Sequence, residues 1–279
     1  MIYKIPQLKP FINNKELQAI KTPIRNNFIT EGSQSKKFLQ KLLKITGSKY
    51  GVLAPNGTLA IAASIMSLGL KKGDEIIIPN FTFYGSYSAA ILAGLKPILC
   101  DVDRKNFQID VDSAEKIITS KTKAIMPVHI YGGAVNMDKI LKFSKKHKLK
   151  IVEDAAQALG VKFKGKSAGS FGHVGAFSFY ADKALTTGEG GLIVTNSKNT
   201  FKQLKVIRNQ GRLKSGVFIH KNLGYNFKFN DVLAAIGLAQ LQKFELIKKR
   251  KLEIYKKFKD NLKDLKEVQF FMPIKGSNF

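Results

Sequence analysis

Lys183 lies in the part of the sequence that is most typical of a catalytic site. An apolar run ends at Ser178, and a polar turn then presents Lys183 before the glycine-rich residues 186–191. A lysine whose position is fixed, in surroundings that favour its neutral amine, can act as a nucleophile and then carry a proton. The chain has 47 lysine and arginine residues, and most of them are expected on the surface. Lys183 is therefore a candidate only together with the residues that the fold places near it.

Asp154 is a candidate partner for a cation, because it directly follows an apolar stretch at residues 150–153. A carboxylate there can pair with a protonated pyridine nitrogen, and charge-assisted hydrogen bonds of this kind are worth about 1.5–3 kcal/mol. An aspartate in this position can equally be a helix N-cap. We expect Glu153 to face the opposite side, because adjacent residues of a strand do so.

A candidate phosphate site follows another apolar stretch, at an Asn-Gly-Thr turn that contains Gly57 and Thr58. Glycine allows close approach of the backbone, and the first N–H groups of a helix can receive an anion. The same dipeptide is also ordinary turn chemistry. Ser178 can add a hydroxyl, and Phe83 can stack on a planar ring or belong to the core. Lysine, aspartate and phosphate turn are the parts with which an enzyme holds pyridoxal 5′-phosphate (PLP) as a Schiff base.

Elements that alternate along the chain must position these residues. Strands are expected at residues 51–54, 75–79, 96–102, 124–129, 150–153, 176–180 and 191–195. Helices are expected at residues 36–45, 58–68, 84–93, 113–118, 137–147 and 231–265. This alternation predicts an α/β fold with a mostly parallel, seven-stranded sheet flanked by helices. Ligands of such sheets bind at the carboxyl ends of the strands, where the candidate residues fall.

Three regions are expected: an N-terminal arm at residues 1–35, a large α/β domain at residues 36–230, and a long connecting helix with the start of a further domain at residues 231–279. Cys100 is the only cysteine, so an intrachain disulfide is excluded and a cytoplasmic location is expected. No stretch has the roughly 20 apolar residues of a membrane span. We expect no membrane association and no bound metal.

The net charge of +27 raises the alternative of a nucleic-acid-binding protein. Only five of the basic residues are arginine, the usual bidentate reader of phosphates and bases. The lysines are spread along the chain, which favours a generally basic surface without nucleic acid as a partner. Such a surface also attracts small anions.

The order of these motifs resembles the DegT/DnrJ/EryC1/StrS family of PLP-dependent sugar aminotransferases, over residues 5–272. The matching segments are FITEG (28–32), NGT (56–58), GDEIIIP (73–79), VHIYG (128–132), EDAAQ (153–157), FSF (177–179) with Lys183, LGYNF (223–227) and AAIGLAQL (234–241). The resemblance implies a fold-type I aminotransferase large domain. It also implies a homodimer whose active sites are shared between the subunits.

The resemblance implies a role for each candidate. Lys183 would be the catalytic residue, Asp154 would pair with the pyridine nitrogen, and Phe83 would stack on the ring. Gln157 would meet the 3-hydroxyl of PLP, and Asn226 would reach the phosphate of the other subunit's cofactor. The implied cofactor-binding residues are Gly57, Thr58, Phe83, Asp154, Gln157, Ser178, Lys183 and Asn226.

The family's reaction implies glutamate as the usual amino donor and a nucleotide-linked keto-sugar as the acceptor. Residues 186–191 resemble the perosamine-synthase-like members, which aminate a 4-keto-6-deoxy sugar in polysaccharide and O-antigen biosynthesis. Members that deoxygenate instead carry histidine in place of the lysine, so Lys183 favours aminotransfer. Full-length members continue into a C-terminal small domain, so the chain is expected to be C-terminally truncated. A PLP-binding remnant without full turnover is the alternative.

Overall fold

The computed structural model describes residues 9–213, 216, 218–220 and 222–278. Its centre is a seven-stranded sheet with the order β1-β9-β8-β5-β4-β2-β3. The strands are β1 (Tyr50–Ala54), β2 (Glu75–Pro79), β3 (Lys96–Cys100), β4 (Thr122–Ile125), β5 (Lys150–Asp154), β8 (Val174–Ser178) and β9 (Gly191–Thr195). This confirms the expected mostly parallel α/β sheet.

Strand direction decides where the candidate residues meet. β3, β2, β4, β5 and β8 pair in parallel, whereas β9 is antiparallel to both β8 and β1. β1 therefore runs in the same direction as β8. The carboxyl ends of β1, β5 and β8 consequently lie on one edge of the sheet. The phosphate turn follows β1, Asp154 ends β5, and Lys183 follows β8.

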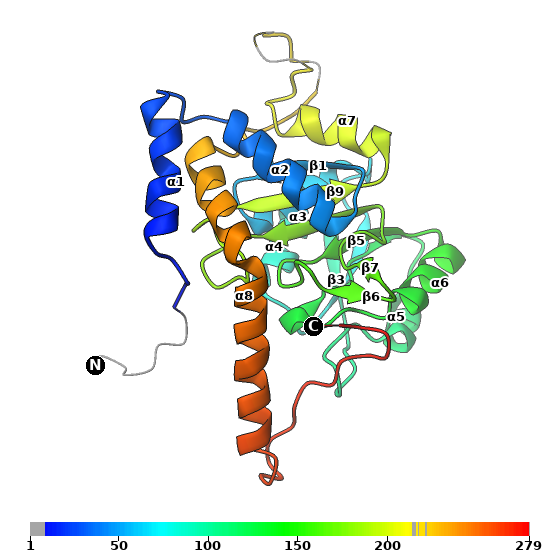
Figure 1. Cartoon of the computed structure of the whole chain (residues 1–279). Helices are drawn as coiled ribbons and strands as arrows, with labels where there is room; N and C mark the ends of the chain where they lie inside the picture. The colour runs from blue at the N-terminus through cyan, green and yellow to red at the C-terminus, as the bar shows by residue number, and fades with distance from the viewer. Residues whose placement is uncertain (1–8, 214–215, 217, 221, 279) are drawn as a thin grey trace, which may run out of the picture.

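Helices cover both faces of the sheet (Figure 1). The helices are α1 (Asn14–Arg25), α2 (Ser33–Thr46), α3 (Gly57–Met66), α4 (Tyr84–Leu92), α5 (Val111–Ile117), α6 (Met137–His147), α7 (Lys198–Ile207) and α8 (Asp231–Asn261). α2, α5, α6 and α8 share one apolar cluster, and α3, α4 and α7 share the other. Alternate strand residues supply the two clusters: Ile77 faces the first, and Ile76 and Ile78 face the second.

The N-terminus of α2 is held by a residue from the far end of the sequence. Its own N-cap, Gly32, has no side chain to offer. Asp231, the first residue of α8, instead accepts hydrogen bonds from the N–H groups of Gly32, Gln34 and Ser35 at 2.8, 3.0 and 2.9 Å, and from the Ser35 hydroxyl at 2.7 Å. This one carboxylate fixes α2 to α8 beside the sheet.

Several elements differ from the sequence expectations. α7 and the short antiparallel pair β6 (Lys162–Phe163) and β7 (Lys166–Ser167) were not expected. The strand expected at 124–129 ends at Ile125, close to Pro127, which has no N–H for the ladder.

Residues 268–273 lie in the region expected to begin a further domain, and they form no strand. This part of the chain runs back from the end of α8 (Figure 1). Residues 268–271 of it line a cavity. Within the described ranges, no helix has the length and apolar character to cross a membrane.

Candidate active site

Asp154 ends β5 as a buried carboxylate at the carboxyl edge of the sheet. Its Oδ2 accepts a hydrogen bond from Ser86 Oγ at 2.7 Å, and its Oδ1 accepts one from the Ala156 N–H at 3.0 Å. Burial raises the pKa of Asp154, while the Ser86 and Ala156 hydrogen bonds and the nearby His129 and Lys183 act in the lowering direction. A buried carboxylate of this kind gains stability from a cation that replaces the lost water.

Lys183 lies in the turn after β8, and its N–H bonds the Tyr180 carbonyl at 3.0 Å. Its side chain is only 16% exposed, and Nζ lies 2.8 Å from Oδ1 of Asp182. It is close enough to Asp154 to lower the pKa of that carboxyl. The fold therefore places the candidate amine and the candidate carboxylate in one site.

The turn between β1 and α3 forms a cradle for an anion. A Cβ added at Gly57 would lie 2.8 Å from Cβ of Ser178 and 3.0 Å from its Oγ, so only glycine fits there. Asn56 caps α3 by accepting from the Leu59 N–H at 2.9 Å. Among the described residues, nothing accepts the N–H groups of Gly57 and Thr58.

Hydroxyl groups complete the cradle. Ser178 Oγ accepts the Tyr180 N–H at 3.3 Å, which leaves its proton available to an anion. Thr58 Oγ1 lies near α4, 3.0 Å from the position of a Cβ at Gly85. Free helix N–H groups with two hydroxyls beside a glycine fit a phosphate group.

A cavity of about 600 Å³ lies beside Lys183. Gln157 lines it, and its Oε1 accepts the Tyr131 N–H at 2.6 Å. This bond turns the Gln157 amide NH₂ away from the main chain of Tyr131 and leaves it free to donate to a ligand. The opposite wall comes from α8, including Lys248 and Tyr255, and from residues 268–271.

Phe83 and Asn226 are both exposed. Phe83 precedes α4 and is 74% exposed, and its ring touches the space beside Gly85. It is thus not a core aromatic, and it is free to cover a planar ligand. Asn226 is exposed and pairs with Asn209 through an isolated antiparallel bridge. Within the described residues, no recorded contact joins Asn226 to Lys183 or Asp154.

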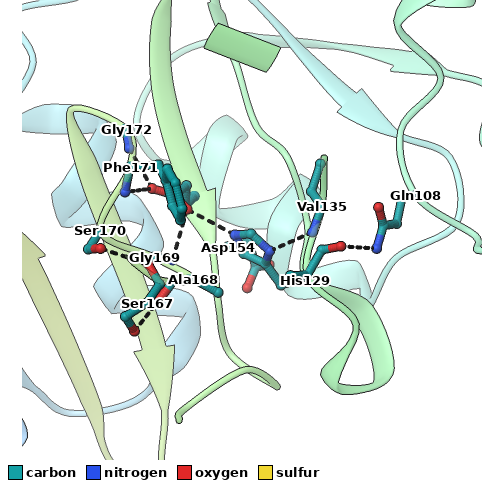
Figure 2. A network of polar contacts seen from close by, with 12 residues as sticks. Gln108, His129, Val135, Asp154, Ser167, Ala168, Gly169, Ser170, Phe171 and Gly172 are labelled. Atoms are coloured by element: carbon teal, nitrogen blue, oxygen red, sulfur yellow. Dashed lines mark hydrogen bonds and ion pairs between the residues drawn. The ribbon is translucent and has the colours of Figure 1, made fainter. Parts of the chain in front are cut away.

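Glu153 faces the other side of β5, as expected, and is the centre of a buried network. Figure 2 labels the residues that contact it, which are His129, Gly169, Phe171 and Gly172. Its Oε1 accepts the N–H groups of Phe171 and Gly172 at 2.7 and 2.5 Å, and its Oε2 accepts the Gly169 N–H at 2.8 Å. His129 Nε2 lies 2.9 Å from the same Oε2.

The tautomer of His129 follows from its second contact. The Val135 N–H donates to Nδ1 at 3.0 Å, so the ring proton is on Nε2 and points to Glu153. Four donors thus converge on one carboxylate. This network fixes the turn that carries Tyr131, which in turn holds Gln157.

Sequence reasoning missed Ser86, which directly contacts Asp154, and gave no role to His129. Thr82 and Ser86 are four residues apart across the start of α4, a spacing that brings side chains together on a helix. That spacing was the available signal. The partner of Ser86, 68 positions away, could only be found in the fold.

Comparison with known proteins gives a consistent result. The model of the DegT/DnrJ/EryC1/StrS aminotransferase family matches residues 10–278. GDP-perosamine synthase of Escherichia coli O157:H7 is 37% identical over 265 residues, which cover 95% of this chain and 73% of that protein.

Two solved structures show the same fold. An aminotransferase from Psychrobacter cryohalolentis superposes with a TM-score of 0.79 at 32% identity, over 84% of this chain and 62% of that one, less than two thirds of its length. The GDP-4-keto-6-deoxy-D-mannose-3-dehydratase of E. coli, with bound hydrated PLP, superposes with a TM-score of 0.91 at 28% identity, over 99% and 77% of the two chains. The sequence, the fold and the site agree, and the chain belongs to the DegT/DnrJ/EryC1/StrS aminotransferase family.

Proposed function

We propose that the chain is a PLP-dependent aminotransferase that moves an amino group from glutamate to a nucleotide-linked 4-keto-6-deoxy sugar. The observation that carries the proposal is that Lys183 lies near the buried Asp154 at one edge of the sheet, close enough to lower the pKa of that carboxyl. The similarity to GDP-perosamine synthase supports the sugar class. A dehydratase shares the fold, so the lysine itself, and not the fold, favours aminotransfer.

PLP fits the residues that are present. The Gly57 cradle, with its free N–H groups and the Ser178 hydroxyl, suits the phosphate. Asp154 offers a negative charge for the ring nitrogen, and the free NH₂ of Gln157 suits the 3-hydroxyl. When bound, PLP supplies an electron sink for carbanion chemistry.

The chain's own residues then perform three tasks. Lys183 would hold the cofactor through Nζ and, once its amine is free, would take up and return a proton at the reacting carbon of each substrate in turn. Asp154 keeps the ring nitrogen protonated by charge pairing. Phe83 covers one face of the ring and excludes water from it, since its side chain is free of the core.

We extend the proposal to the assembly and its location. Asn226 is exposed, as a residue that reaches the cofactor of a second copy must be. A homodimer, a cytoplasmic location and the three regions 1–35, 36–230 and 231–279 belong to the same proposal. The buried thiol of Cys100 is compatible with a reducing compartment.

The first test is spectroscopic. The chain incubated with PLP is expected to gain a visible absorbance band, and borohydride reduction is expected to fix the cofactor on Lys183, as located by peptide mass spectrometry. Lys183→Ala should lose both signals. Lys248→Ala is the matched control, because Lys248 lines the same cavity but pairs with Glu245. A band that survives in Lys183→Ala would contradict the proposal.

The second test measures turnover with glutamate and nucleotide-linked keto-sugars. The expected products are 2-oxoglutarate and an amino sugar, both dependent on Lys183. Cofactor binding without either product would refute the aminotransfer and leave only binding.

A further inference from the structure

A chain of two hydroxyl groups ends on the Asp154 carboxylate. Ser86 Oγ lies 2.7 Å from Oδ2 of Asp154 and 2.8 Å from Oγ1 of Thr82. A hydroxyl has one proton, so Ser86, which donates to Asp154, must accept from Thr82. The order of donation is therefore Thr82 to Ser86 to Asp154. Ser86 is only 1% exposed, so water does not compete for these bonds.

The Asp154 carboxylate keeps room for a further partner. Each of its oxygens has one protein donor, the Ser86 hydroxyl or the Ala156 N–H. A carboxylate has about four acceptor positions, so both oxygens can accept another bond. The two donors fix the plane of the group without saturating it.

We propose that Ser86, supported by Thr82, is a positioning residue that holds Asp154 charged and oriented for the cationic ring nitrogen of the cofactor. The inference rests on the proposed function, since it needs a ring nitrogen at Asp154. It gives a function in the site to Ser86, in the first turn of α4, and to Thr82, in the segment before α4.

The charges around Asp154 support this role. Burial raises the pKa of Asp154, and the strongest opposing influence is the Ser86 hydrogen bond. The Ala156 N–H, His129 and Lys183 act in the same direction as Ser86 but more weakly. Because His129 is bonded to Glu153 and Val135, Ser86 is the side chain that donates directly to Asp154.

The same turn also places the residue proposed to cover the ring. Phe83 is the residue before α4, three positions ahead of Ser86. The residue that covers the ring and the residue that donates to the Asp154 carboxylate therefore come from one short segment. The start of α4 therefore fixes both Phe83 and, through Ser86, Asp154, so that a cofactor ring that contacts Phe83 also lies next to Asp154.

The test compares Ser86→Ala with matched variants of the whole chain. Ser64→Ala is the control, because Ser64 is also a buried helical serine, and its hydroxyl donates to the Ala60 carbonyl at 2.7 Å. Ser86→Thr keeps the hydroxyl. Thr82→Val keeps the hydrogen bond from Ser86 to Asp154 and removes the hydroxyl that donates to Ser86. Two quantities are measured: the dissociation constant of PLP and the pH midpoint of the bound cofactor's absorbance change.

Ser86→Ala is expected to weaken PLP binding by about 10- to 100-fold, the equivalent of one hydrogen bond to a charged group. Its absorbance midpoint should move to higher pH, because a less firmly protonated ring nitrogen withdraws less electron density from the link to Lys183. Thr82→Val should shift the midpoint in the same direction by less. Ser86→Thr should stay near the unmodified chain, and Ser64→Ala should change neither quantity.

Each adverse outcome has a distinct meaning. If Ser86→Ala and Thr82→Val both keep the midpoint of the unmodified chain, Ser86 has no positioning role. If Ser86→Ala fails to fold, the pH midpoint of Thr82→Val alone tests the positioning role, and an unchanged midpoint refutes it. If the unmodified chain shows no Lys183-dependent band, the proposed function falls and this inference falls with it.

Discussion

Glu153→Gln should destabilise the fold strongly, although it changes a single oxygen to an NH₂ group. Each Glu153 oxygen accepts two hydrogen bonds: Phe171 and Gly172 donate to Oε1, and Gly169 and His129 donate to Oε2. Whichever way the glutamine amide turns, its NH₂ faces two donors. Two buried donors are therefore left without an acceptor.

The size of the effect follows from that number. An unsatisfied buried donor costs about 1–3 kcal/mol, so two cost about 2–6 kcal/mol. His129 cannot relieve the conflict by moving its proton, because Nδ1 must accept from the Val135 N–H. Domains are stable by only about 5–15 kcal/mol, so the variant should be close to unfolding.

Urea unfolding followed by circular dichroism, without cofactor, measures the loss. Glu245→Gln is the control, because the Glu245 side chain is 81% exposed, and its midpoint should not change. A loss below about 1 kcal/mol for Glu153→Gln, the net value of one ordinary hydrogen bond, would refute the reasoning.

Two further predictions concern carboxylates at helix and strand ends. Asp154→Asn should raise the urea midpoint of the cofactor-free chain at pH 7, because burial raises the pKa of Asp154 and the charged form costs folding free energy. Since both states are protonated below the unfolded pKa of about 3.9, the advantage should shrink as the pH falls, and an equal or lower midpoint at pH 7 would count against it. Asp231→Ala should cost about 2–4 kcal/mol by uncapping α2, with Asp260→Ala as an exposed control. Although burial opposes it, the Ser35 and backbone bonds lower the pKa of Asp231, so its contribution should disappear as the pH falls below about 4. A loss for Asp231→Ala that is independent of pH would exclude this explanation.

Much of the fold was predictable because it depends on local patterns. Apolar runs alternated with helical spacing, and each of the seven predicted strands was found, with ends shifted by up to four residues. The shifts came from pairing: β3 ends at Cys100, and Val102 makes only an isolated bridge to Ile109. β6 and β7 have two residues each, too few to show any period.

The sequence predicted at which strand end each residue of the candidate site lies. Asp154 and Ser178 end strands, Gly57 and Lys183 follow strands, and parallel strands bring such positions together. The hydrogen bonds that hold the site and its helices in place were not predictable. The bonds of Ser86 to Asp154 and of Ser35 to Asp231 join residues that are far apart in the chain. Sequence patterns report periodicity within an element and carry no record of such pairs.

The neighbouring carboxylates of β5 divide two tasks between them. Glu153 is saturated with donors, whereas Asp154 is left short of them. Burial of the Asp154 charge therefore costs part of the folding free energy, and a cation that binds Asp154 offsets that cost. Any ligand with that cation then acts as a folding ligand, worth about 2.7 kcal/mol at 100 times its dissociation constant. The melting temperature of the chain should rise with cofactor concentration, and its survival in a cell should follow cofactor supply.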